Sequence, residues 1–121
     1  MNEKQFKDRT KQLALRIIDV MAALPKTAAA DIVGRQVLRS ATSVGANYRA
    51  ACRAISRADL IAKLSIVEEE ADETCYWLEI LVEAKLLPPA QIIEVLQEAN
   101  EITAMTVASI KTARARNQSK I

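Results

Sequence analysis

The sequence predicts an all-α protein, a single domain over residues 1–121 that folds as an up-and-down antiparallel four-helix bundle. Half of the residues are apolar, and the abundance of Ala, Leu, Ile, Glu, Lys and Arg favours helix. Two Gly and three Pro are too few for the many turns of an all-β protein. Four segments also repeat apolar residues at alternating spacings of three and four, which is typical of amphipathic helices.

The first expected helix spans about residues 3–24 and ends before Pro25, because the residue before a proline disfavours the α conformation. The second spans about residues 28–55, with Thr27 as its N-cap. Its apolar seam consists largely of small residues, so a neighbouring helix can approach closely. The seam of the second helix is Gly34, Val37, Ala41, Val44, Tyr48, Ala51 and Ile55.

The third expected helix spans about residues 57–87. Ser56 caps its start and Asp59 can reach back, as in a capping box. The fourth spans about residues 89–115 and begins at Pro89, whose missing N–H costs nothing in a first turn. Together the four segments leave short connections, which predict antiparallel neighbours.

Charge is strongly segregated along the chain. Residues 1–57 hold 11 Lys and Arg against 4 Asp and Glu, whereas residues 58–110 hold 2 against 11. Residues 111–121 add four further basic residues. Basic blocks often contact nucleic acid. Equally, basic helices can pair with acidic ones within a chain or between subunits, and the charges alone leave both interpretations open.

Composition excludes several function classes. The absence of His removes His-based catalysis and His metal sites. Cys52 and Cys75 are too few for a disulfide framework and fit a reducing compartment. The polar N-terminus carries no secretory signal, and no apolar run approaches the ~18 residues that span a bilayer. We therefore expect a soluble, cytoplasmic protein with no cofactor, no metal and no membrane partner.

Polar residues form two further faces on the second expected helix, at ~100° per residue. Arginines lie roughly opposite the apolar seam, either as a solvated surface or as a ridge that contacts phosphates. Small polar residues form a stripe between the arginines and the seam. The arginines are Arg35, Arg39, Arg49, Arg53 and, at the following turn, Arg57. The small polar stripe is Gln36, Ser40, Ser43 and Asn47.

The third expected helix carries a matching side stripe of Ile66, Glu70, Glu73 and Trp77. The two stripes look complementary, and Glu70 or Glu73 is expected to pair with Arg39. If that pair is buried, loss of one partner costs about 3–5 kcal/mol. A lone Trp beside carboxylates is typical of a helix–helix or subunit interface. The alternative is that Trp77 closes the edge of its own bundle.

The ordered combination of these residues resembles a known family. Gln36-x-x-Arg39-Ser40-x-x-Ser43-x-x-x-Asn47, then Ser56-Arg57, resembles the bacterial four-helix-bundle family named for proteins encoded in 23S rRNA intervening sequences. The stretch KLSIVEEEADETCYWLE at residues 63–79 is similar to one branch of it, and the likeness covers roughly residues 6–113. Where the commoner family pattern has Asn-Ile-Ala-Glu-Gly, residues 47–51 here read NYRAA, which places Arg49 on the basic face.

The resemblance implies an up-and-down bundle that assembles into a homo-oligomeric, five-fold ring. It also implies a link to RNA, because the related accessory proteins of diversity-generating retroelements are basic barrels that bind RNA. We therefore expect a non-enzymatic, RNA-associated accessory protein. Its expected phosphate contacts are Arg35, Arg49, Arg53 and Arg57. Its expected structural or oligomer motif is Gln36, Arg39, Ser40, Ser43, Asn47, Glu70, Glu73 and Trp77.

Two other functions stay open. The chain could be a protein-interaction scaffold with no nucleic-acid ligand, in which case charge segregation serves assembly. It could also be a Mg²⁺-dependent all-α nucleotide pyrophosphohydrolase, because Glu69-Glu70-x-x-Glu73 matches the first half of that enzyme pattern. The second half requires Glu-x-x-Asp on a later helix, and only Glu94, Glu98 and Glu101 are available there.

Overall fold

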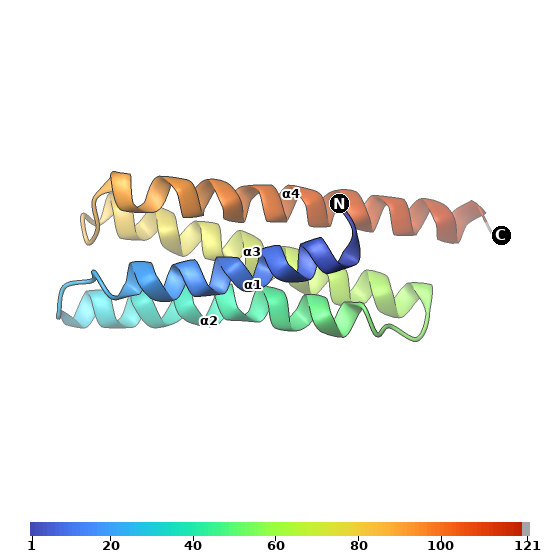
Figure 1. The fold of residues 1–121 in the computed structure, drawn as a ribbon, viewed down its shortest axis with the longest axis horizontal. Helices are drawn as coiled ribbons and strands as arrows, with labels where there is room; N and C mark the ends of the chain where they lie inside the picture. The colour runs from blue at the N-terminus through green and yellow to red at the C-terminus, as the bar shows by residue number, and fades with distance from the viewer. Residues whose placement is uncertain (120–121) are drawn as a thin grey trace.

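The computed structural model describes residues 1–119, with side chains described to Arg116. Four helices follow one another along the chain: α1 (Glu3–Met21), α2 (Ala28–Ala51), α3 (Arg57–Glu83) and α4 (Pro89–Ser119). Each helix runs back alongside the previous one, and there is no strand among these residues (Figure 1). The predicted all-α four-helix fold is confirmed. None of the described helices is long and apolar enough to cross a membrane.

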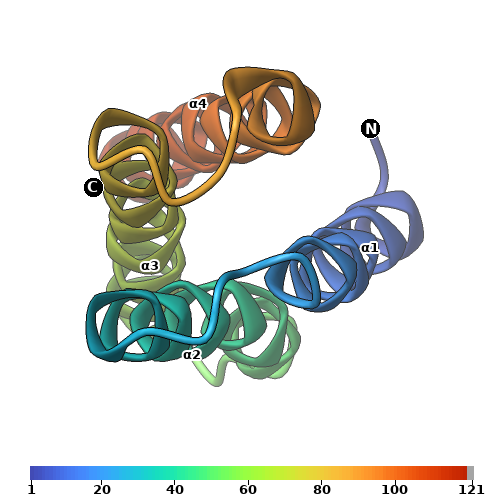
Figure 2. The ribbon, with the colours of Figure 1, turned by 90° about the vertical axis from the view of Figure 1, so that its left-hand side faces the viewer.

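The predicted apolar seams meet in one core. α3 packs extensively on both α2 and α4, and α1 packs mainly on α2, whereas α1 and α4 touch over a shorter stretch (Figure 2). The ring of Phe6 in α1 meets the ring of Tyr48 in α2 edge-on, with centroids 4.6 Å apart. The largest fully buried apolar side chains are Leu13, Ile17, Leu78, Leu81, Ile92, Ile102, Val37, Val44 and Val67.

The predicted starts of α2 and α3 are confirmed by their caps. The backbone N–H of Ala30 donates to Thr27 Oγ1 at 3.2 Å, and that of Asp59 donates to Ser56 Oγ at 3.0 Å. The second half of the box differs from the prediction, because the Asp59 carboxylate accepts from the N–H of Ile55 rather than from Ser56. Asp59 also accepts from Lys63 at 2.8 Å.

Two helices end earlier than the seams predict. α1 stops at Met21 rather than residue 24, since the amides of residues 22–24 bond to carbonyls three residues back and tighten the turn before Pro25. α2 stops at Ala51 rather than residue 55 for the same reason. Ile55 consequently leaves the seam and is 92% exposed, so its predicted core position is wrong.

The last two predicted ends also shift. α3 stops at Glu83 rather than residue 87, because Lys85 adopts φ 59° and the N–H of Leu86 donates to Leu81 O at 2.9 Å. These bonds form a Schellman-type end, in which a left-handed residue closes the last turn. α4 begins at Pro89 as predicted and continues to Ser119, four residues beyond the predicted end.

Candidate nucleic-acid interface and the α2–α3 polar network

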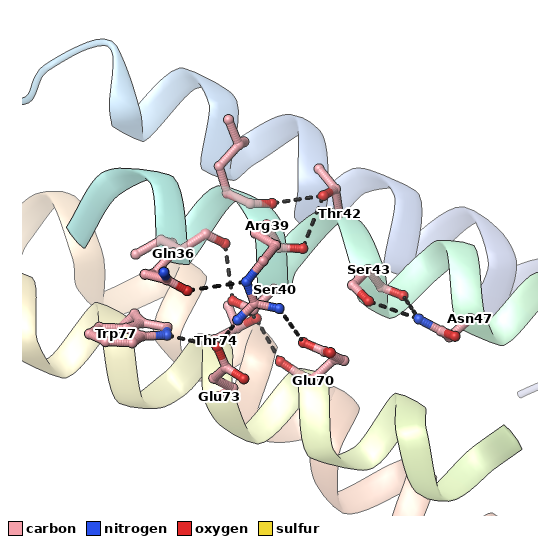
Figure 3. A network of polar contacts seen from close by, with 12 residues as sticks. Gln36, Arg39, Ser40, Thr42, Ser43, Asn47, Glu70, Glu73, Thr74 and Trp77 are labelled. Atoms are coloured by element: carbon pink, nitrogen blue, oxygen red, sulfur yellow. Dashed lines mark hydrogen bonds and ion pairs between the residues drawn. The ribbon is translucent and has the colours of Figure 1, made fainter. Parts of the chain in front are cut away.

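The best-connected polar side chain between α2 and α3 is Arg39. Its Nη1 donates to Glu70 Oε2 at 3.3 Å, its Nη2 donates to Glu73 Oε2, and its Nε donates to Gln36 Oε1 at 3.1 Å (Figure 3). The predicted pairing with the α3 carboxylates is confirmed. The side chains of Arg39, Glu70 and Glu73 are 48%, 20% and 36% exposed, respectively. The pair is therefore not buried, and each contact has the modest strength of a partly solvated ion pair.

Trp77 extends this network on α3. Its indole Nε1 donates to Glu73 Oε2 at 2.9 Å, so one carboxylate oxygen serves both Trp77 and Arg39. The ring is half-buried against the core and meets the Tyr76 ring edge-on at 5.0 Å. Three residues of the predicted side stripe, Glu70, Glu73 and Trp77, thus form hydrogen bonds within the chain. The fourth, Ile66, is 42% exposed.

The small polar stripe of α2 meets α3 at Ser40. Ser40 is fully buried, donates to Val37 O at 3.1 Å and lies 3.0 Å from the hydroxyl oxygen of Thr74 on α3. Asn47 Nδ2 donates to both Ser43 O and Ser43 Oγ at 2.8 Å. The stripe therefore bonds mainly to its own helix, which lets α2 and α3 approach without an unsatisfied polar group among the described side chains.

The remaining arginines of the predicted ridge separate into different surroundings. Arg35 lies 3.2 Å from Asp31, one turn earlier, in an exposed ion pair. Arg49 and Arg53 are exposed, and the guanidinium of Arg53 donates to the carbonyl of Arg49. Arg57, the first residue of α3, is half-buried and lines a cavity of about 490 Å³.

An ion cluster that the sequence analysis did not single out joins α1 to α4. Arg9 donates twice to Glu98, at 2.6 and 2.7 Å, and once to Glu101 at 2.8 Å. The hydrogen bond from Arg9 holds the pKa of the Glu98 carboxyl below its usual range. Arg16 lies 3.8 Å from Glu94 on the same side. The segregated charges indicated such pairing in general, but helix periodicity alone does not say which arginine meets which carboxylate.

The cavity beside Arg57 is a second feature that the sequence analysis missed. It lies at the end of the bundle where α2 turns into α3, and it is lined partly by Glu3, Tyr48 and Cys52. Burial raises the pKa of both the Tyr48 phenol and the Cys52 thiol. Both groups therefore stay neutral near pH 7, and a neutral thiol is a poor nucleophile.

The carboxylates of the pyrophosphohydrolase pattern do not converge. Glu70 and Glu73 both contact the Arg39 guanidinium, whereas Glu69 is exposed. Over the residues whose side chains are described, no three Cys, Asp or Glu side chains gather with the spacing that a metal ion requires. The geometry of α3 thus assigns these two glutamates to the contact with α2.

The chain is similar to known proteins over most of its length. The family model of the 23S rRNA-intervening sequence protein matches residues 2–108. A crystal structure from Bacteroides thetaiotaomicron VPI-5482, described as a protein with unknown function from the S23 ribosomal protein family, is 37% identical. The match covers 92% of this chain and 99% of that one, with a TM-score of 0.83. No curated protein matches. The family model spans α1, α2 and α3 and continues into α4, and the chain belongs to the 23S rRNA-intervening sequence protein family.

Proposed function

We propose that this protein is a non-enzymatic, RNA-associated accessory protein of the cytoplasm that binds backbone phosphates through the basic side of the bundle. Most basic residues of the N-terminal half lie on α1 and α2, with Lys26 between these helices and Arg53 and Arg57 just after α2, and the two helices pack side by side (Figure 2). The acidic residues lie mainly on α3 and the first part of α4. A one-sided charge distribution of this kind attracts a polyanion to one face.

The observation that carries the proposal is that Arg49 and Arg53 are exposed and form no ion pair with a described acidic side chain. Arg9, Arg16 and Arg39 each meet a carboxylate on another helix, whereas no described acidic side chain forms an ion pair with Arg49 or Arg53. Arg35 and Arg57 belong to the proposed set as well, although Asp31 competes for Arg35. Exposed guanidiniums that no carboxylate neutralises can still pair with phosphates, and the bond from Arg53 to the Arg49 carbonyl leaves its charge uncompensated.

The proposal predicts contacts to the backbone rather than base-specific recognition. Tyr48 packs edge-on against Phe6, and Trp77 packs on the core. Tyr48 and Trp77 are therefore not exposed platforms on which bases can stack, and the exposed Tyr76 lies on the acidic helix α3 rather than on the basic side. Affinity is then expected to vary little with base sequence and strongly with salt.

The test is RNA affinity measured against salt with a fluorescein-labelled oligouridylate. For Arg49→Ala/Arg53→Ala, the slope of log affinity against log salt should fall by about 1.4, since each phosphate contact on a single strand contributes about 0.7. The matched control is Lys26→Gln/Lys85→Gln, which removes two exposed charges outside α2 and should leave the slope almost unchanged. No binding by the wild type at low salt contradicts the proposal and favours the protein-interaction scaffold.

The proposed working form is a homo-oligomeric ring of five subunits. Apolar side chains left exposed in a single chain support self-association: Leu15, Ile18, Ile32, Ile66, Tyr76 and Ile93. Light scattering should give a mass several times 13.3 kDa. Ile66→Lys should lower that mass with the helix content unchanged, whereas a strict monomer of the wild type removes the ring.

A further inference from the structure

A surface groove lies between α1 and α2, and its lining includes basic residues of α1 that are not part of the arginine ridge on α2. It has a volume of about 430 Å³, and its lining includes Lys7 and Lys11 from α1 and Arg49 from α2. Asp8 is the one acidic residue among its lining side chains. The groove therefore has an excess of positive charge, contributed by both helices.

The base of the groove is built from small residues that bring the two backbones together. A Cβ on Gly45 would lie 3.3 Å from Thr10 Oγ1 and 3.5 Å from the Thr10 carbonyl oxygen, so α1 and α2 approach closely here. Ala14 and Ala46 continue the same lining. The absence of bulky side chains leaves space between the cations for a group of a few atoms.

The cations of the groove are largely free of protein partners. Lys11 and Arg49 are exposed, and neither forms an ion pair with a described acidic side chain. Lys7 has one acidic partner among the described side chains, Glu3, which lies 3.9 Å away, and both side chains are about half exposed. Lys7 and Lys11 lie one helical turn apart, about 6 Å along the axis. Both ammonium groups can thus approach an anion that Arg49 holds from the opposite wall.

We propose that this groove binds a backbone phosphate of the nucleic acid, with Lys7 and Lys11 on one wall and Arg49 on the other. The inference rests on the proposed function and adds to it a second helix. The phosphate path crosses from the α2 ridge onto α1, so a chain of phosphates lies across the two helices rather than along α2 alone. The ligand is a phosphodiester group, because a small concave site with three cations and no aromatic lining suits an anion rather than a base.

The experiment uses the full chain and the same labelled oligouridylate, titrated between about 50 and about 200 mM salt. Lys7→Ala/Lys11→Ala should reduce the salt slope by up to about 0.7, the contribution of the one phosphate that the groove holds, and Lys11→Ala should give part of that loss. Ala46→Phe is the sharper variant, because it fills the groove at an exposed position without changing the net charge. It should weaken binding at least tenfold, with circular dichroism unchanged. Lys26→Gln is the control for loss of one exposed charge elsewhere.

The outcomes separate this inference from the function on which it rests. If the wild type fails to bind, the proposed function falls and the groove falls with it. If the wild type binds and Arg49→Ala/Arg53→Ala weakens it, but Lys11→Ala and Ala46→Phe behave like Lys26→Gln, the groove is overturned while the function stands. If every lysine variant, Lys26→Gln included, loses the same slope, binding follows diffuse charge and the groove is again overturned.

Discussion

The hydroxyl oxygens of Ser40 and Thr74 lie 3.0 Å apart at the buried centre of the α2–α3 interface. Ser40 also donates to Val37 O, and the Thr74 hydroxyl lies 2.8 Å from Glu70 O. Each hydroxyl thus meets both its own helix and its partner. Directly outside this pair, Arg39 spans the same two helices in the partly solvated network. The interface therefore has a dry polar centre and a wetter charged edge.

A double-mutant cycle on Ser40→Ala and Thr74→Val should give a coupling energy of about 0.5–1.5 kcal/mol, the net value of one neutral hydrogen bond. Both substitutions keep the approximate shape of the side chain and leave no orphaned partner once combined. Urea unfolding of the two single variants and the double variant measures this energy. A coupling near zero means that each hydroxyl is satisfied by its own helix alone.

Arg39→Ala should lower the free energy of unfolding by about 1 kcal/mol, since its contacts with two carboxylates are partly exposed to solvent. Arg35→Ala is the matched control, because it removes an exposed pair within α2 and should cost no more than about 0.5 kcal/mol. Thermal or urea unfolding at low and high salt compares the two. If Arg39→Ala lowers the free energy of unfolding by about 3–5 kcal/mol, the ion pair behaves as a buried one, which contradicts its partial exposure to solvent.

Arg9→Ala should cost about 2 kcal/mol, because Arg9 makes two charge-assisted hydrogen bonds to Glu98 between α1 and α4. The pair also sets a pH dependence. The folded-state pKa of Glu98 lies below its ordinary value of 4.5, so the stabilisation is fully present above pH 4.5 and is lost as the pH falls below it. The free energy of unfolding, measured from pH 7 to pH 3, should fall less steeply in Glu98→Gln than in the wild type. If the two curves run parallel, the titration of Glu98 does not contribute to the pH dependence.

The two thiols should react at different rates with a disulfide reagent at pH 8. Cys75 is buried and its pKa is raised to about 11, so its thiol stays protonated and inaccessible until the protein unfolds. Cys52 is half-buried and should react first. Cys52→Ser should therefore show no labelling in the native state and one equivalent in urea. Rapid native labelling of that variant indicates that the α3–α4 contact opens readily.

Lys85→Gly should stabilise the protein by up to about 1 kcal/mol, because Lys85 holds φ 59° at the end of α3 and only glycine adopts this conformation without strain. Lys85→Ala is the control, since it removes the charge and keeps the Cβ. In urea unfolding, the glycine variant should have a higher free energy of unfolding than both the wild type and the alanine variant. Equal stability of the two variants shows that the backbone strain is negligible.

The fold follows from the sequence because it depends on periodic apolar residues and on local caps. Ser56 and Thr27 form their caps wherever the remainder of the chain lies, since each bonds to an amide three residues on. Helix ends were harder to predict. Ile55 fits the apolar seam of α2 by its spacing, but α2 ends at Ala51. The backbone N–H of Ile55 instead donates to the Asp59 carboxylate on α3.

The site was predictable where two stripes face each other and not where distant helices meet. Arg39 and Glu73 lie on consecutive helices with complementary stripes, so their contact could be inferred. Arg9 and Glu98 are 89 residues apart and depend on the angle between α1 and α4, which no spacing encodes. The α1–α2 groove escaped prediction for a similar reason, because it depends on how closely Gly45 approaches Thr10.

The short contact between α1 and α4 has a consequence for hydrogen exchange. α1 packs on α2 and contacts α4 over a short stretch that includes the Arg9 and Arg16 ion pairs, so we expect its amides to open with the least free energy. One side of α1 carries these anchors and another supplies Lys7 and Lys11 to the groove. An anion bound there stabilises only the docked form of α1. Amide protection should therefore rise selectively along residues 3–21 when a polyanion is bound, as α1 joins the cooperative unit of the other three helices.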